Sequence, residues 1–205
     1  MKVFCLAVGQ SVKPPKLFAA EHDLSSFSFF QRGSIQEAIN FFILTVIERT
    51  APGQRQTVQQ DNYTGHVYVR QDGLASAMVT DAEYPARVAF SVLAKLHDEF
   101  TAKFLSSNAA NKFSNVTVTL QTTQTAYPEL KDHVAKAQDP QSADPFMRVQ
   151  KELDETKIIL HKTMDSLLQR GEKLDDLVAR SDQLSAQSKM FYKTAKSTNA
   201  CCTYV

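Results

Sequence analysis

The second part of this chain is dominated by apolar positions that recur every seven residues. The repeat occupies residues 146–199, which contain no proline and a single glycine, Gly171. One row consists of Phe146, Leu153, Leu160, Leu167, Leu174, Ser181, Ser188 and Ala195. The partner row consists of Val149, Thr156, Thr163, Arg170, Leu177, Leu184, Phe191 and Thr198. These rows are typical of the a and d positions of a coiled coil, which could run ~80 Å at 1.5 Å per residue. The sequence leaves open whether the free segment is helical, because isolated helices are stabilised mainly by packing.

The first part of the chain has the mixed pattern of an α+β domain. Apolar runs predict strands over residues 3–8 and 16–20, and a hairpin of strands over 63–70 and 74–80. Residues 54–60 are predicted to form a polar edge strand, and the Thr-rich stretch 115–125 a loop with a strand-like fragment. Helices are expected over 34–49, with Ser34 as the N-cap, and over 84–104. This order favours one antiparallel sheet with helices packed against it.

Two Asp-Pro pairs separate these parts, Asp139-Pro140 and Asp144-Pro145. We therefore expect a domain at residues 1–138, a linker at 139–145, the coiled-coil segment at 146–199 and a tail at 200–205.

Composition and motifs argue against several classes of function. The 23 basic and 22 acidic residues give a formal net charge of +1, which argues against a nucleic-acid binder. The five histidines are scattered, so no metal site is expected. Neither a G-x-S-x-G motif nor a P-loop is present, so we expect no enzyme, no catalytic residue and no small GTPase. The longest apolar stretch, residues 39–47, is shorter than the ~20 residues that span a bilayer, and no secretory signal is apparent. The chain is therefore expected in the cytosol unless a lipid anchors it.

Arg170 interrupts the d row at a position where an apolar side chain would pack best. A buried guanidinium without partners is very costly. Either the helix is exposed at this position, with Arg170 tolerated on its surface, or partner chains supply hydrogen-bond acceptors.

The last five residues, Cys201-Cys202-Thr203-Tyr204-Val205, contain a C-a-a-X prenylation box that begins at Cys202. Cys201 offers a second acyl or prenyl site, and two lipid chains anchor a protein more stably than one. Val205 and Tyr204 are unusual in their positions, so the box does not decide between farnesyl and geranylgeranyl. Lys189, Lys193 and Lys196 would face anionic lipid beside such an anchor.

Several stretches together resemble the prenylated longin-type R-SNAREs related to synaptobrevin. They are residues 25–32 (SSFSFFQR), 66–70 (HVYVR), 83–85 (EYP), 153–160 (LDETKIIL), 167–178 (LLQRGEKLDDLV) and Cys201-Cys202. The resemblance implies a longin (profilin-like) domain, then a helical SNARE motif, then a lipid anchor carrying farnesyl or geranylgeranyl and, as a further group, palmitoyl. It also implies that Arg170 packs with glutamines of three Gln-SNARE helices in a parallel four-helix bundle that fuses membranes. The expected setting is the cytosol and the cytoplasmic face of endoplasmic reticulum, Golgi, endosomal, vacuolar and autophagosomal membranes.

Apolar residues outside the a and d rows suggest a closed state. Ile158 falls at f, a position that faces water in a four-helix bundle and has almost nothing to bury against, while Ile159 falls at g, Leu168 at b and Val178 at e. The resemblance implies that the longin domain folds back on the SNARE motif and that an attached lipid sits in the same groove. Its contact candidates are Phe41 and Phe42. Alternatively, these residues complete the longin core or widen the coiled-coil seam.

A lipid-anchored longin and coiled-coil adaptor without fusion activity is the main alternative function. It shares the seven-residue repeat, but it explains neither Arg170 nor the paired cysteines of the tail.

Overall fold

The computed structural model of the chain describes residues 1–104, 127–139 and 158–201. Residues 197–201 are described by their backbone only. Its centre is a six-stranded sheet with the strand order β2-β1-β5-β4-β3-β6. In that order, the strands are β2 (Lys16–His22), β1 (Val3–Gln10), β5 (Leu74–Asp81), β4 (Tyr63–Val69), β3 (Arg55–Gln60) and β6 (Ile158–His161).

The first five strands pair antiparallel, as the sequence predicts. The sixth, β6, comes from the segment with the seven-residue repeat and pairs parallel to β3, so the complete sheet is mixed. The strand predicted at residues 54–60 is confirmed as β3, but the prediction that it lies at the sheet edge is wrong. The residues Arg55–Val58 are buried, and β6 covers the edge that they would have exposed. This pairing joins residues about 100 positions apart, which a local pattern does not reveal.

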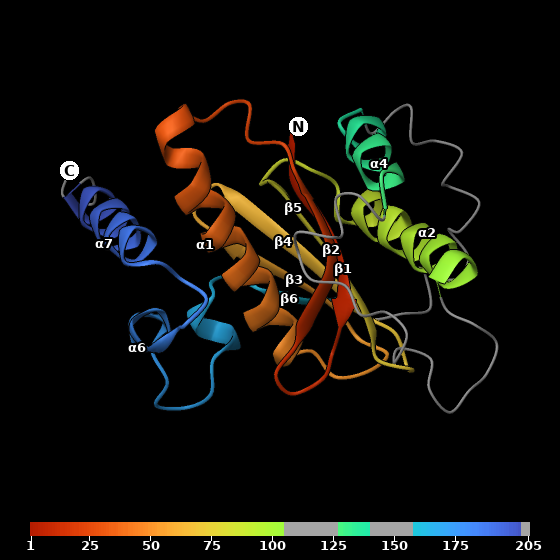
Figure 1. Cartoon of the computed structure of the whole chain (residues 1–205). Coiled ribbons are helices and arrows are strands. Elements are labelled where there is room, and N and C mark those ends of the chain that lie inside the picture. Colours follow the sequence, from red (N-terminus) through yellow and green to blue (C-terminus); the bar gives the residue numbers. More distant parts are fainter. Residues whose placement is uncertain (105–126, 140–157, 202–205) are drawn as a thin grey trace.

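Helices cover both faces of the sheet (Figure 1). The helices α2 (Ala86–Phe104) and α4 (Glu129–Ala137) pack on one face and bury Phe90, Leu93 and Leu96 there. The helix α1 (Phe29–Glu48) packs on the other face through Ile43, Val46 and Ile47. The predicted start of α1 at Ser34 is wrong, because Ser28 is the N-cap and Ser34 is a buried residue inside the helix.

The segment with the seven-residue repeat is not one helix in the free chain. After β6 come a short 3-10 helix, η3 (Asp165–Leu167), and the helices α6 (Leu174–Arg180) and α7 (Ala186–Cys201). Gly171 has a φ of +94°, a left-handed conformation that glycine adopts without strain, and it lies in the turn before α6. In the described part of the segment, the a and d rows are thus divided among β6, η3, α6, α7 and the turns between them, which lie along the sheet edge and the outer side of α1 (Figure 1).

Two buried histidines make the stability of the fold dependent on pH. Burial lowers the pKa of His66 to about 4, and burial together with the charge of Arg70 lowers that of His97 to about 3. Because an unfolded histidine titrates near pH 6.5, the stability is complete above that pH and falls as the pH drops toward the folded pKa. We expect a loss on the order of 2–3 kcal/mol per histidine between pH 7.5 and 4.5, measured by urea unfolding. His66→Gln should remove roughly half of this loss, and an unchanged pH profile in that variant would contradict the assignment.

Candidate functional site

The helix α1 is apolar on two sides, which is the starting point for the site. Ile43, Val46 and Ile47 face the sheet and are fully buried. Ala38 and Phe41, in the first two-thirds of the helix, lie off that inner row and line a cavity. An apolar side that does not face the sheet requires cover of its own. The C-terminal segment supplies the second cover, because α7 packs on α1 (Figure 1).

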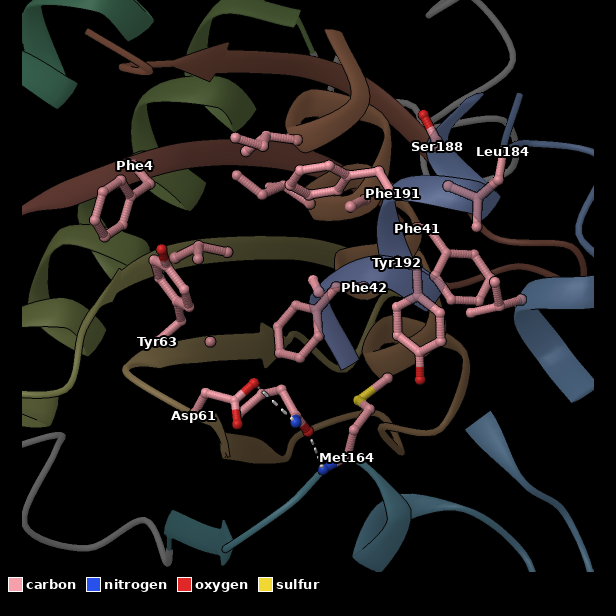
Figure 2. A pocket seen from close by; sticks show the side chains of 18 of the residues that line it. Phe4, Phe41, Phe42, Asp61, Tyr63, Met164, Leu184, Ser188, Phe191 and Tyr192 are labelled. Carbon is pink, nitrogen blue, oxygen red and sulfur yellow. Dashed lines mark hydrogen bonds between the residues drawn. The ribbon is translucent and has the colours of Figure 1, made fainter. Parts of the chain in front are cut away.

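A cavity of about 570 Å³ lies between α1, the β3–β4 hairpin and the C-terminal segment. Its lining is mainly apolar. We call it the α1 groove. From α1 it is lined by Ile35, Ala38, Ile39, Phe41 and Phe42, from the sheet by Phe4, Tyr63, Gly65 and Val79, and from the C-terminal segment by Met164, Leu174, Val178, Leu184, Ser188, Phe191, Tyr192 and Ala195. Figure 2 shows Phe41, Tyr192 and Met164 gathered at one end and Phe4 and Tyr63 at the other. Its volume falls within the ~300–1,000 Å³ typical of small-molecule sites.

Phe42 reaches the groove because β4 has a glycine beneath it. A Cβ atom at Gly65 would lie 2.2 Å from Cε1 of Phe42, which is closer than two carbon atoms can approach. The glycine therefore lets the ring lie directly on the sheet. Phe42 thus belongs both to the domain core and to the floor of the groove.

The C-terminal segment buries four side chains almost completely in or beside the groove. The exposed fraction is 1% for Met164, 3% for Val178, 7% for Leu184 and 2% for Ser188. Burying apolar side chains of this size is worth ~1.5–3 kcal/mol each. Met164 was missed by the sequence analysis. It falls at an e position, the same apolar off-seam signal that singled out Val178.

Polar contacts add two connections between α1 and the C-terminal segment. Oε2 of Glu37 accepts a hydrogen bond from the backbone N–H of Ser185 at 2.7 Å, directly before α7. Burial raises the pKa of Glu37, but hydrogen bonds from Ser185 and Ser188 outweigh it, so the pKa lies below its ordinary value. The carboxylate is therefore charged at neutral pH at the N-terminus of α7, where the helix dipole favours an anion. At the other end of α1, Nη2 of Arg49 lies 3.1 Å from Oε2 of Glu172.

The six residues predicted to make fold-back contacts, two from α1 and four from the C-terminal segment, occupy different places. Phe41, Phe42 and Val178 line the α1 groove. Ile158 is half-buried and packs against the cluster under α2, on the opposite face of the sheet. Ile159 and Leu168 are half-buried. The structure thus brings three of the six together and places Ile158 at the sheet edge.

Seam residues in the described part of the chain also differ in burial. Leu184 and Ser188 are buried, whereas Leu160 is 58% exposed and Thr163, Arg170 and Ala195 are exposed. Leu167, Leu174, Leu177, Ser181 and Phe191 are half-buried. Phe146, Val149, Leu153, Thr156 and Cys202 lie outside the described residues, as do the side chains of Thr198 and Cys201.

The described residues contain no group of histidine, cysteine and acidic side chains suited to a metal ion. Within the same residues, no helix combines the length and apolar character needed to cross a bilayer.

Comparison with known proteins matches both parts of the chain. Residues 24–123 match the longin family, described as a regulated-SNARE-like domain, and residues 145–202 match the synaptobrevin family. The protein named synaptobrevin homolog ykt6 of Schizosaccharomyces pombe is 54% identical, with 98% of each chain covered. The homologues named YKT6 of Yarrowia lipolytica and Saccharomyces cerevisiae are 46% and 45% identical, again over 98% of each chain.

Proposed function

Because the chain belongs to the YKT6 family of synaptobrevin homologues, which are longin-type R-SNAREs, we propose that it drives vesicle docking and fusion by zipping with three Gln-SNARE helices. The family is one of non-enzymatic membrane-trafficking proteins that assemble into SNARE complexes. In the proposed bundle, Arg170 forms the central polar layer and donates hydrogen bonds to the side-chain oxygens of three glutamines. Its exposure in the free chain leaves it accessible to them.

The burial of two seam residues in the closed chain supports the proposal that the longin domain inhibits bundle formation. Leu184 and Ser188 belong to the seam rows, yet they are 7% and 2% exposed against the α1 groove. A side chain cannot pack in the groove and in a four-helix bundle at once. The fold-back and the bundle therefore exclude each other, and Gln-SNARE helices that bind only the released segment would shift the population toward the open chain.

Membrane attachment in this proposal depends on Cys202 as the prenyl acceptor and Cys201 as the second lipid site. Lys189, Lys193 and Lys196 lie on α7, which leads to this tail. The apolar α1 groove supports the further proposal that the farnesyl or geranylgeranyl chain rests there while the protein is cytosolic. Release would expose it to endoplasmic reticulum, Golgi, endosomal, vacuolar or autophagosomal membranes.

The test is assembly with Gln-SNARE motifs. Mixing the full chain with purified Qa, Qb and Qc motifs should give a complex of one copy of each, with much increased helicity and a melting temperature well above that of the chain alone. Circular dichroism measures the helicity and the melting temperature, and light scattering measures the mass of the complex. If no set of Gln-SNARE motifs forms such a complex, the chain acts instead as an anchored adaptor.

Arg170→Leu tests the central layer in the same assay. The variant should still assemble, because leucine restores an apolar seam, but it should lose its fixed register and impair fusion of liposomes. Leu174→Ala, a change in the adjacent apolar layer, serves as the control and should lower the melting temperature without altering register. Normal register and fusion in Arg170→Leu would refute the role of Arg170.

A further inference from the structure

The strand β6 closes the outer edge of the sheet, and it belongs to the segment that must leave during bundle formation. It pairs parallel to β3, with Ile158 opposite Arg55 and His161 opposite Val58. Leu160, in the middle of β6, is also a member of the a row. On the proposed function, β6 therefore cannot remain on β3 once that layer is packed in the bundle.

Departure of β6 would leave β3 as an open edge. The backbone N–H and C=O groups of Arg55–Val58 that bond β6 would lose their partners, although these four residues are buried in the closed chain. Buried backbone groups need hydrogen-bond partners, and an open strand edge is a template for another strand. Among the described strands, β6 is the last on this side of the sheet, next to β3.

Arg55 indicates what kind of strand would fit. Its side chain is 4% exposed, and its guanidinium lies over the Tyr68 ring at 4.4 Å from the centroid. Its Nε and Nη1 atoms have no hydrogen-bond partner among the described residues. The residue of β6 opposite Arg55 is Ile158, which offers no side-chain acceptor. A buried guanidinium with open donors favours a carboxylate, which supplies the opposite charge and accepts a charge-assisted hydrogen bond.

We propose that the β3 edge, after release of β6, binds an extended peptide of a partner protein in parallel register. The peptide carries an aliphatic residue at the position of Ile158, which packs against the cluster under α2. It also carries an acidic side chain two residues before or after that position. Side chains two residues apart in a strand share a face, so either placement brings the carboxylate to the side of Arg55. The chain's own sequence has Thr156 and Leu160 two residues before and after Ile158, and neither carries a carboxylate.

The test uses full-length chain carrying Ile158→Lys and Ile159→Pro. Proline removes a ladder donor and lysine repels Arg55, so β6 should detach while β3 stays intact. Three fluorescent peptides serve as probes: Thr-Lys-Ile-Ile-Leu-His-Lys, which is the chain's own segment, Glu-Lys-Ile-Ile-Leu-His-Lys and Thr-Lys-Ile-Ile-Glu-His-Lys. At least one of the two acidic peptides should bind the released chain at least about tenfold more tightly than the chain's own segment does. The same acidic peptide should bind the wild-type chain at least about tenfold more weakly than it binds the released chain. Fluorescence anisotropy measures the binding.

Arginine variants make the result specific. Arg55→Met in the released chain should abolish the preference for the acidic peptide, whereas Arg49→Met, an arginine outside this edge, should leave it unchanged. Equal binding of the three peptides, no binding, or a preference that survives Arg55→Met would overturn the proposal. So would a released chain that forms dimers by light scattering, because a second copy would then occupy the edge. Should the double variant lose its circular dichroism signal, the single variant Ile159→Pro replaces it. None of these measurements needs Gln-SNARE helices, so failure here is distinguishable from failure of bundle formation.

Discussion

Val178→Lys should open the closed chain. Val178 is 3% exposed in the α1 groove, and it also borders Lys189 and Lys193. A buried ammonium without a partner costs several kcal/mol, and the neighbouring lysines add repulsion. We therefore expect hydrogen exchange of the amides in residues 174–196 to rise by on the order of a hundredfold, because each loss of about 1.4 kcal/mol in the stability of the closed state raises the open population about tenfold. Assembly with Gln-SNARE helices should become faster, because Val178 lies at an e position that tolerates lysine in a bundle.

The matched control is Ala179→Lys, an exposed neighbour on the same helix. It introduces the same charge without filling the groove and should leave exchange nearly unchanged. Phe41→Glu probes the opposite wall and should act like Val178→Lys. Similar exchange in Val178→Lys and Ala179→Lys would mean that the groove does not hold the segment. Ile158→Asp is a poor choice for this purpose, because the new carboxylate would lie beside the open donors of Arg55.

Cys202→Ser should abolish membrane association, because serine cannot form the thioether of a prenyl group. Cys201→Ser should retain one lipid chain, which by itself gives only marginal and reversible binding, with an association constant of about 10⁴ M⁻¹ for a single acyl chain. Fractionation of cytosol and membranes measures the distribution, and mass spectrometry identifies the attached group.

Cys5→Ala is the control for these variants. Cys5 is fully buried in β1, and burial raises the pKa of its thiol, so it is neither accessible nor reactive. The control should keep the wild-type distribution. Membrane-bound Cys202→Ser protein at the wild-type level would contradict the anchor hypothesis.

Local patterns predicted most of the longin sheet. The strands β1, β2, β4 and β5 and the helix α2 lie within two residues of their predicted bounds. Apolar alternation and the turn at Gln71-Asp72-Gly73 are properties of neighbouring residues, so they can be read from the sequence. The start of α1 was wrong because Ser34, which was expected to be the N-cap, lies inside the helix, and Ser28 is the N-cap. Only packing of Phe27 against Phe4 and of Ser34 into the core favours Ser28.

The sequence by itself determined the two-part organisation, the seam rows and the off-seam apolar residues, because each follows from spacing within one segment. The tertiary structure decided which of these residues are buried in the free chain. It placed Val178, Leu184 and Ser188 against α1, Ile158 at the sheet edge and Arg170 in solvent. Burial depends on contacts between residues more than 100 positions apart, and a segment that fits both a groove and a bundle carries the same spacing in either state. The seven-residue period therefore predicts the bundle, and only the folded chain shows the groove that competes with it.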